Sequence, residues 1–130
     1  MGTIKNFEEL AVWIMAREIA NDIYSDLKNC RDFGFRDQIT RAGISIMNNI
    51  SEGFGRNSDT EFRHFLNISK GSATEVKSMY YIAEDQEYVS HETSQKMRDK
   101  LQRLINSLGT FMKYLNSSRP ARPARPARPA

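Results

Sequence analysis

The sequence predicts an all-α protein, an antiparallel up-down-up-down four-helix bundle. Four long segments place apolar residues three and four positions apart, the spacing of one face of a helix. No segment shows the strict alternation of apolar and polar residues that is typical of a half-buried strand. The links between the four segments are short, and short links favour antiparallel neighbours in a bundle.

The first helix is expected from Phe7 to Asn29, after a capping box made of Asn6 and Glu9. We expect all of its apolar stripe, including the aromatic pair, to lie in the core. The stripe consists of Val12, Trp13, Ala16, Ile19, Ala20, Ile23, Tyr24 and Leu27. A short link from Cys30 to Gly34 follows.

The second helix is expected from Phe35 to Phe54. Its apolar face consists of Ile39, Ala42, Gly43, Ile46, Met47, Ile50 and Phe54. The opposite face is predicted to carry Arg41, Ser45, Asn48 and Glu52.

A glycine pair, Gly53 and Gly55, stands where this helix should end, and Arg56 follows. A phosphate-gripping loop would require a strand before the glycines, and a helical pattern precedes them instead. We therefore predict an elbow in which one glycine supplies the left-handed residue that ends the helix. Ser58 and Glu61 then form a capping box that starts the next helix. A second interpretation stays open, in which free amides at that start, with Arg56 beside them, hold a phosphate of an RNA backbone.

The third helix is expected from Ser58 to Glu87 and has an unusually wide apolar arc. Its main stripe is Phe62, Leu66, Ser69, Ala73, Val76, Tyr80 and Ala83, and the arc is widened on one side by Phe65, Ile68, Ser72, Met79 and Ile82. Two explanations stay open. The helix is buried between two neighbours of its own bundle, or part of the arc meets another subunit.

The fourth helix is expected from His91 to Leu115, with Ser90 as its cap. Its apolar residues alternate spacings of four and three, which is a heptad seam suited to near-parallel packing. They are Met97, Leu101, Leu104, Leu108, Phe111 and Leu115.

The 130 residues are expected to divide into one bundle domain, residues 1–118, and a tail, residues 119–130. The tail repeats Arg-Pro-Ala four times, and proline at every third position excludes a helix, so an extended or disordered segment is expected. An engineered extension and a natural basic tail both fit this repeat. The net charge is +3, but the tail holds four of the 19 basic residues and no acid. The remaining fifteen basic and sixteen acidic residues leave the bundle at −1, so the basic balance comes from the tail.

Several classes of site are disfavoured by composition. Cys30 is the single cysteine, so it forms no internal disulfide, and a reducing cytoplasm is the favoured location. A single cysteine also excludes metal sites built on several cysteines. The two histidines, His64 and His91, lie on different predicted helices without metal-ligand spacing, so we expect no metal and no cofactor. No apolar run is long enough to span a bilayer, and no signal-peptide pattern is expected at the start.

The sequence resembles a family of small bacterial four-helix-bundle proteins that are encoded in intervening sequences of 23S ribosomal RNA genes, also labelled S23 ribosomal proteins. The resemblance covers Phe7 to Leu115. It is carried by the segments Leu10–Trp13, Gln38–Ala42, Ser45–Gly53, Gly55–Arg56, Glu61–Phe62, Phe65–Leu66 and Gly71–Glu75. Ser51 departs from the alanine usual in the family, and the terminal repeats have no counterpart there.

The resemblance implies a ring-like homo-oligomer, expected to be a pentamer, with a link to RNA and no established enzymatic activity. It also implies a distant similarity to accessory proteins of diversity-generating retroelements, which bind nucleic acid and a reverse transcriptase.

Four basic residues recur every seven positions and are candidates for binding nucleic acid. They are Arg56, Arg63, Lys70 and Lys77. Phosphate binding is served by cations along a line, and copies repeated in a ring would strengthen a modest patch. The alternative is a solvated helix edge, since runs of charge usually just face water.

A second set of polar residues belongs mostly to the family motif: Arg41, Asn49, Glu52, Arg56, Ser72 and Glu75. Paired carboxylates and guanidiniums can form an acid–base site, but the sequence pairs no nucleophile with a base, so no catalytic residue is predicted. Di-metal bundles use a Glu-x-x-His motif from each of two helices, and this sequence has only one such spacing, from Glu61 to His64. A structural network that fixes helix register or joins subunits is the favoured interpretation.

Together these observations predict a non-enzymatic homo-oligomeric bundle that binds RNA or a ribonucleoprotein partner. The alternative is a protein-interaction scaffold without a nucleic-acid role. Neither the RNA nor the biological process follows from the sequence.

Overall fold

The computed structural model describes residues 3–116, which form four helices and one short 3-10 turn. The turn η1 spans Phe7–Glu9. The helices are α1, Ala11–Asp26; α2, Phe33–Phe54; α3, Asp59–Asp85; and α4, His91–Asn116. No strand occurs between residues 3 and 116, and the predicted all-α class is confirmed. The predicted tail, residues 119–130, lies outside the described residues.

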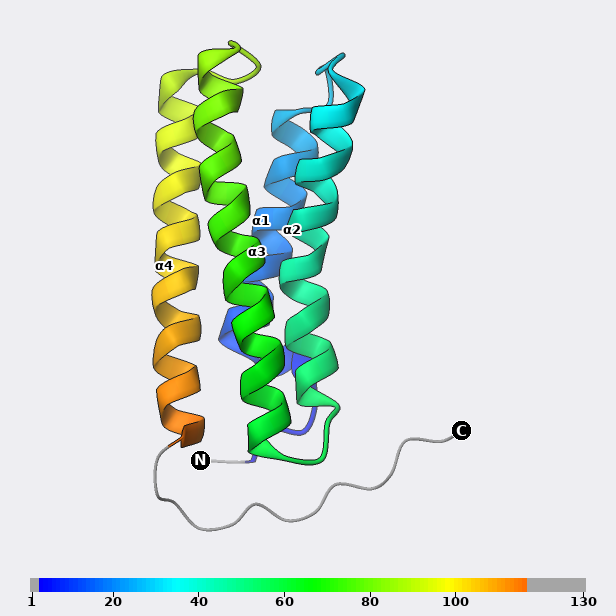
Figure 1. The fold of residues 1–130 in the computed structure, drawn as a ribbon, viewed down its shortest axis with the longest axis vertical. Coiled ribbons are helices and arrows are strands. Elements are labelled where there is room, and N and C mark those ends of the chain that lie inside the picture. Colours follow the sequence, from blue (N-terminus) through cyan, green and yellow to red (C-terminus); the bar gives the residue numbers. More distant parts are fainter. Residues whose placement is uncertain (1–2, 117–130) are drawn as a thin grey trace.

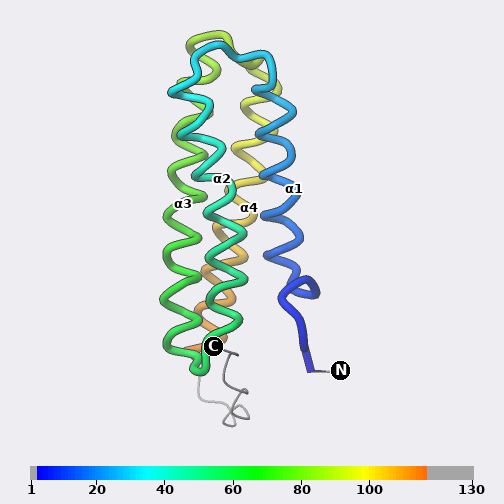
Figure 2. The backbone as a smooth tube through the Cα atoms, turned by 90° about the vertical axis from the view of Figure 1, so that its right-hand side faces the viewer, coloured from blue at the N-terminus to red at the C-terminus, as the bar shows by residue number. Residues whose placement is uncertain are grey.

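Consecutive helices run in opposite directions and pack side by side (Figure 1). The α1–α2 and α3–α4 links lie at one end of the bundle, and the α2–α3 link lies at the other (Figure 2). The α2–α3 and α3–α4 pairs are the most extensive, and a smaller α1–α4 contact closes the bundle. This is the predicted up-down-up-down arrangement.

The core follows the predicted stripes closely. All seven residues of the main α3 stripe are buried, and so are five of the six residues of the α4 seam, with Phe111 half-buried. Two serines lie among these apolar residues, and each donates to a backbone carbonyl of another helix. Ser69 Oγ lies 2.7 Å from Ile46 O, and Ser94 Oγ lies 3.0 Å from Tyr80 O. Burial of these hydroxyls is tolerated because both are hydrogen-bonded.

The first helix is shorter than predicted. Glu9 accepts hydrogen bonds from the backbone amides of Lys5 and Asn6, as the capping box predicts, but the turn that it closes ends at Leu10. Leu10 is extended, with φ −73° and ψ 126°, and α1 begins only after it. The prediction that Tyr24 is a core residue is also wrong, since 54% of its surface is exposed.

The elbow between α2 and α3 is confirmed, but the predicted role of its glycines is wrong. Gly55 has φ −75° and ψ −8°, and no glycine in residues 3–116 has a positive φ. Gly53 is needed for a different reason. A Cβ there would lie 2.7 Å from Phe65 Cβ and 3.2 Å from Phe62 O, so the missing side chain lets α2 and α3 approach. Ser58 Oγ accepts from Glu61 N at 3.1 Å, which confirms the predicted cap.

The left-handed residue occurs instead at the end of α3, where Glu87 has φ 60°. Tyr88 N bonds to Ala83 O at 2.8 Å, and Glu87 N bonds to Glu84 O at 2.9 Å. This pair of hydrogen bonds is a Schellman motif, which satisfies the last carbonyls of a helix. Ser90 then starts α4 by accepting from Thr93 N, as predicted.

Candidate functional site

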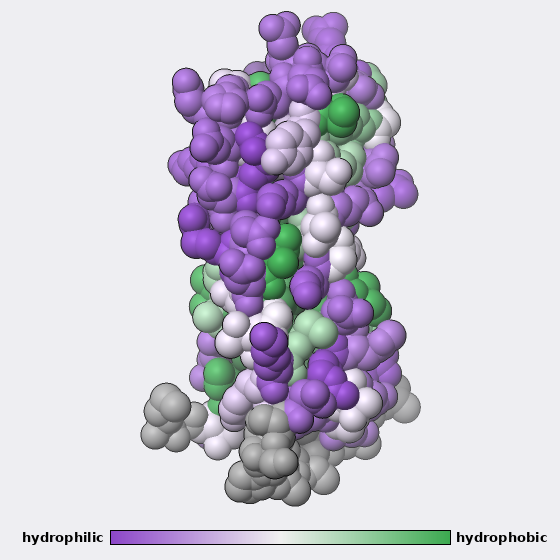
Figure 3. Space-filling view, turned by 60° about the vertical axis from the view of Figure 1, so that its left-hand side comes forward, coloured by the Kyte–Doolittle hydropathy of each residue, from purple (hydrophilic) through white to green (hydrophobic). Residues whose placement is uncertain are grey.

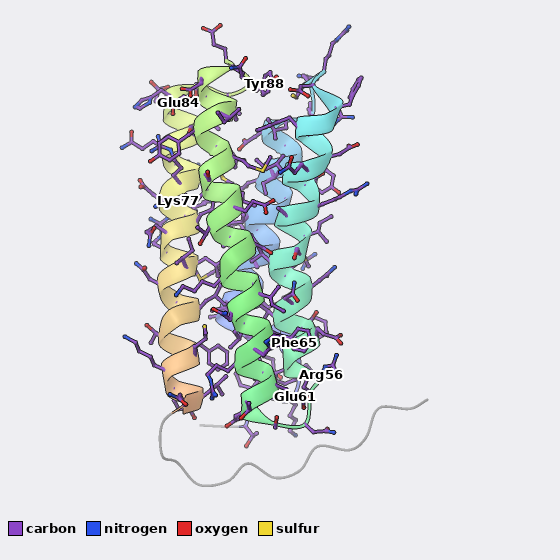
Figure 4. All side chains as sticks on the ribbon, viewed as in Figure 1. Arg56, Glu61, Phe65, Lys77, Glu84 and Tyr88 are labelled. Atoms are coloured by element: carbon purple, nitrogen blue, oxygen red, sulfur yellow. The ribbon has the colours of Figure 1, made fainter. Side chains whose placement is uncertain are left out.

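Three of the predicted basic residues lie on the flank of α3 that faces α4. Lys77 Nζ donates to Gln102 Oε1 of α4 at 2.6 Å, which fixes the direction of this flank. Lys70 and Arg63 precede Lys77 by seven and fourteen residues and so share its side of the helix, and all three are half-buried. We call Arg63, Lys70 and Lys77 the α3 basic flank. Figure 4 shows Lys77 between α3 and α4.

The charges of the α3 basic flank are not neutralised by direct ion pairs. In the described part of the chain, none of its three side chains has a carboxylate oxygen within 4.0 Å. Nearer the α3–α4 link, Arg98 bonds to Glu84 at 3.2 Å and its guanidinium lies 4.2 Å from the centre of the Tyr81 ring. The hydrogen bond from His91 and the Arg98 charge lower the pKa of Glu84. The side of the bundle around α4 is largely hydrophilic, with hydrophobic residues in small separate patches (Figure 3).

Arg56 does not continue this line, although it keeps the spacing of seven. Arg56 Nη2 pairs with Glu52 Oε1 at 2.7 Å, and the Arg56 guanidinium lies 4.8 Å from the centre of the Phe65 ring. Figure 4 shows Arg56 and Phe65 on the α2 side of α3, away from Lys77. The heptad spacing fails here because Arg56 lies in the link before α3, where the helical period does not apply.

The predicted polar network divides into two groups. Three of its members, Arg41, Ser72 and Glu75, line a groove of about 490 Å³ between α2 and α3. The hydroxyls of Ser45 and Ser72 lie 3.0 Å apart, and Asn49 Nδ2 donates to Ser45 Oγ at 2.9 Å. The other group is the Glu52–Arg56 pair, further along α2.

Ser45 was expected on the solvent side of α2, and this expectation is wrong, because its half-buried hydroxyl joins α2 to α3. Arg41, Ser45 and Asn49 are four residues apart and form one row along α2. That spacing was available in the sequence as a sign that Ser45 belongs with the network.

The groove brings together hydroxyl, amide and charged side chains of α2 and α3. Ser45 Oγ shares a hydrogen bond with Ser72 Oγ and accepts from the Asn49 amide, and among residues 3–116 neither serine hydroxyl is hydrogen-bonded to an imidazole or a carboxylate. Within residues 3–116, no three histidine, cysteine or acidic side chains come close enough to hold a metal ion.

Further polar contacts tie the bundle together and were missed from the sequence. Lys100 of α4 bonds to Glu18 and Asp22 of α1 at 2.6 and 2.7 Å, and this lowers the pKa of Glu18. Tyr88 donates to Asp32 at 2.7 Å across the two links at one end, and this bond raises the pKa of Tyr88 to about 12. These pairs are far apart in sequence, so no spacing could reveal them.

Both the basic flank and the groove lie within a region that matches a known family. The model of the family described as "23S rRNA-intervening sequence protein" matches residues 8–110. The chain belongs to this family. The resemblance seen in the sequence is thereby confirmed for most of the bundle, and the only part of the described helices beyond the match is the end of α4.

A solved structure supports the same assignment. The fold of this chain is similar to that of a protein from Bacteroides thetaiotaomicron whose crystal structure is known. That protein is described as one of unknown function from the S23 ribosomal protein family. The TM-score is 0.74 at 27% identity, and the match covers 79% of this chain and 99% of the other. No curated protein matches the chain. None of the helices in residues 3–116 combines the length and the hydrophobicity that a membrane span requires.

Proposed function

We propose that this member of the 23S rRNA-intervening sequence protein family is a non-enzymatic homo-oligomer, expected to be a pentamer, that binds structured RNA along the α3 basic flank. We place this function in the cytoplasm, in keeping with the single cysteine of the chain. The observation that carries the proposal is a row of three cations without carboxylate partners among the described residues, set along the side of α3 that faces α4.

The geometry of the row suits a phosphate backbone. Residues seven apart on a helix are separated by about 10 Å along its axis, so three side chains span about 20 Å. Such cations contact phosphates without reading the base sequence. Gln102, which accepts from Lys77, donates to Asn106 Oδ1 at 2.9 Å, and amide groups of this kind can donate to phosphate or 2′-hydroxyl oxygens.

Arg56 is left out of the proposed interface. Its charge is already paired with Glu52, and its planar face is covered by Phe65. Releasing it to a phosphate would break the pair and the ring contact, which makes it a poor mobile cation. The polar groups of the α2–α3 groove are given a structural role.

The test is RNA binding, measured by fluorescence anisotropy with a structured RNA at 50 and 200 mM salt. The bundle should be tested as a chain ending at Ser118 as well as at full length, because the tail carries four arginines. We expect the triple variant Arg63→Gln, Lys70→Gln, Lys77→Gln to bind at least tenfold more weakly. The slope of log affinity against log salt should fall by about two to three, roughly one for each phosphate contact.

A matched control removes the same charge elsewhere. Arg31, Lys96 and Arg103 are exposed, and the last two act on Glu18 of α1, on the other side of α4. Their triple change to Gln should alter affinity less than threefold. Equal losses in the two triple variants would contradict the assigned surface. If only the full-length chain binds, the RNA-binding site lies in the tail and not on α3. If neither chain binds RNA, the proposed function is wrong and the protein-interaction scaffold is favoured.

A further inference from the structure

Exposed apolar side chains mark an unpartnered surface along α3. Ile68 is 40% exposed and Ile82 is 49% exposed, and they lie fourteen residues apart. Glu75 stands midway between them, and Glu61 precedes Ile68 by seven residues. We call Glu61, Ile68, Glu75 and Ile82 the α3 outer face. The half-buried Phe65, Ser72 and Met79 fall between them, so this face repeats every three and four residues, like a seam for another helix.

A second unpartnered surface runs along α1. Ile14 is 52% exposed and Tyr24 is 54% exposed. With the exposed residues Arg17 and Asn21 they again repeat at alternating spacings of three and four, and exposed Lys28 follows in the link after α1. We call these five residues the α1 outer face. Within α1 it spans about 15 Å from Ile14 to Tyr24, and on α3 the distance from Ile68 to Ile82 is about 21 Å.

The two faces carry opposite charges. The α1 outer face has two cations and no acid, and the α3 outer face has two carboxylates, with Arg41 of α2 in the groove beside Glu75 and the Glu52-paired Arg56 against Phe65. In residues 3–116, neither Arg17, Lys28 nor Glu75 takes part in an ion pair. Each face therefore offers apolar area and a charge pattern that the other one completes.

Pairing of like faces is disfavoured by the same charges. Two α3 outer faces packed about their centres would set Glu75 of one copy against Glu75 of the other. Two α1 outer faces would gather four cations in one interface. Like charges in contact oppose association, whereas the mixed pair sets Glu75 among Arg17 and Lys28.

We propose that the α1 outer face of one copy packs on the α3 outer face of a second copy, head to tail. This inference rests on the homo-oligomeric part of the proposed function and names the faces that build it. A head-to-tail contact leaves one free face on each end of a pair, so successive copies are added until the ring closes. The basic flank, on the α4 side of α3, stays outside this contact.

The test is the mass of the full chain without RNA, measured by light scattering after size exclusion. One variant breaks the α1 outer face with Arg17→Glu and Tyr24→Asp, and another breaks the α3 outer face with Ile68→Asp and Ile82→Asp. We expect each alone to fall to the 15.0 kDa monomer. Mixed in equal amounts, the two should form a 1:1 dimer of twice that mass, because each retains the face that the other has lost.

Phe33→Asp is the matched control, since Phe33 is 58% exposed and belongs to neither face. It should keep the wild-type mass. Should circular dichroism show that a double variant has lost helix, Arg17→Glu and Glu75→Arg replace the two variants, and their mixture must then form assemblies larger than the monomer, because the reversed charges complement each other.

A monomeric wild-type chain, an α1 variant that keeps the full mass, or a mixture that stays monomeric would each overturn the inference. These outcomes concern assembly alone. RNA binding by the monomeric variants, measured separately, decides the proposed function.

Discussion

At the scale of single residues, two positions control how the helices of this bundle end and approach. Gly53 allows α2 to contact Phe62 and Phe65 of α3 at a distance that no Cβ would permit. Glu87 adopts the left-handed conformation that glycine usually takes and thereby closes α3. The sequence points to glycines at the α2–α3 elbow but not to their role, because close approach and chain reversal both select glycine.

Gly53→Ala should destabilise the protein by about 1 to 3 kcal/mol, because the new methyl group meets backbone as well as side-chain atoms of α3. The measurement is urea unfolding followed by circular dichroism at fixed protein concentration. Gly109→Ala is the control. No atom lies within 4 Å of a Cβ there, so alanine should stabilise α4 by about 0.5 to 1 kcal/mol. Equal effects of the two changes would contradict the packing role of Gly53.

At the scale of elements, stripes of apolar residues predicted which faces meet, and buried polar groups fix how they meet. The buried hydroxyls of Ser69 and Ser94 bond to α2 and α3 respectively. Tyr80, which is fully buried, reaches across from α3 to the end of α1, where its hydroxyl donates to Asp26 Oδ2 at 2.8 Å. Burial raises the pKa of Asp26 above its usual value, and the bond from Tyr80 opposes that rise.

Tyr80→Phe should destabilise the protein in a pH-dependent way. In the folded state the pKa of Asp26 lies above its unfolded value. The contribution of Asp26 to stability therefore falls as the pH rises through the folded-state pKa. Without the hydroxyl, the ionised carboxylate loses a donor. The loss should be about 1 to 3 kcal/mol at pH 7 and smaller at pH 4, where the carboxyl becomes protonated.

Urea unfolding of Tyr80→Phe and wild type at both pH values provides the measurement. Tyr88→Phe is a matched control, since Tyr88 also donates to an aspartate but at an exposed site, and it should destabilise the protein less than Tyr80→Phe does. A loss from Tyr80→Phe that is the same at pH 4 and pH 7 would show that the charge of Asp26 is not involved.

At the scale of the whole molecule, the charge and the fold belong to different parts of the chain. The buried residues of the described structure lie between Leu10 and Leu115, whereas the excess of positive charge comes from residues 119–130. Without the tail the net charge is −1, so the net charge does not support RNA binding by the bundle. The support comes from the local row of cations on α3.

A chain ending at Ser118 should keep its helices and its mass as an assembly, because no buried residue of the described structure is removed. Its net charge changes from +3 to −1, so at pH 7 it should no longer bind a cation exchanger that retains the full chain. Circular dichroism, light scattering and ion exchange test these expectations together. Loss of helix content on truncation would show that the tail contributes to the fold.

The sequence by itself determined the number of helices, the residues of their buried stripes, two of the N-terminal caps and the family. These features depend on periodicity and on neighbours a few residues apart, which a single chain displays directly. Tertiary structure alone decided that Arg56 leaves the basic line, that Ser45 meets Ser72, that Tyr80 reaches Asp26 and that Tyr24 stays exposed. Each of these depends on how far one helix is rotated and shifted against another, and that register is set by the packing of all the faces at once.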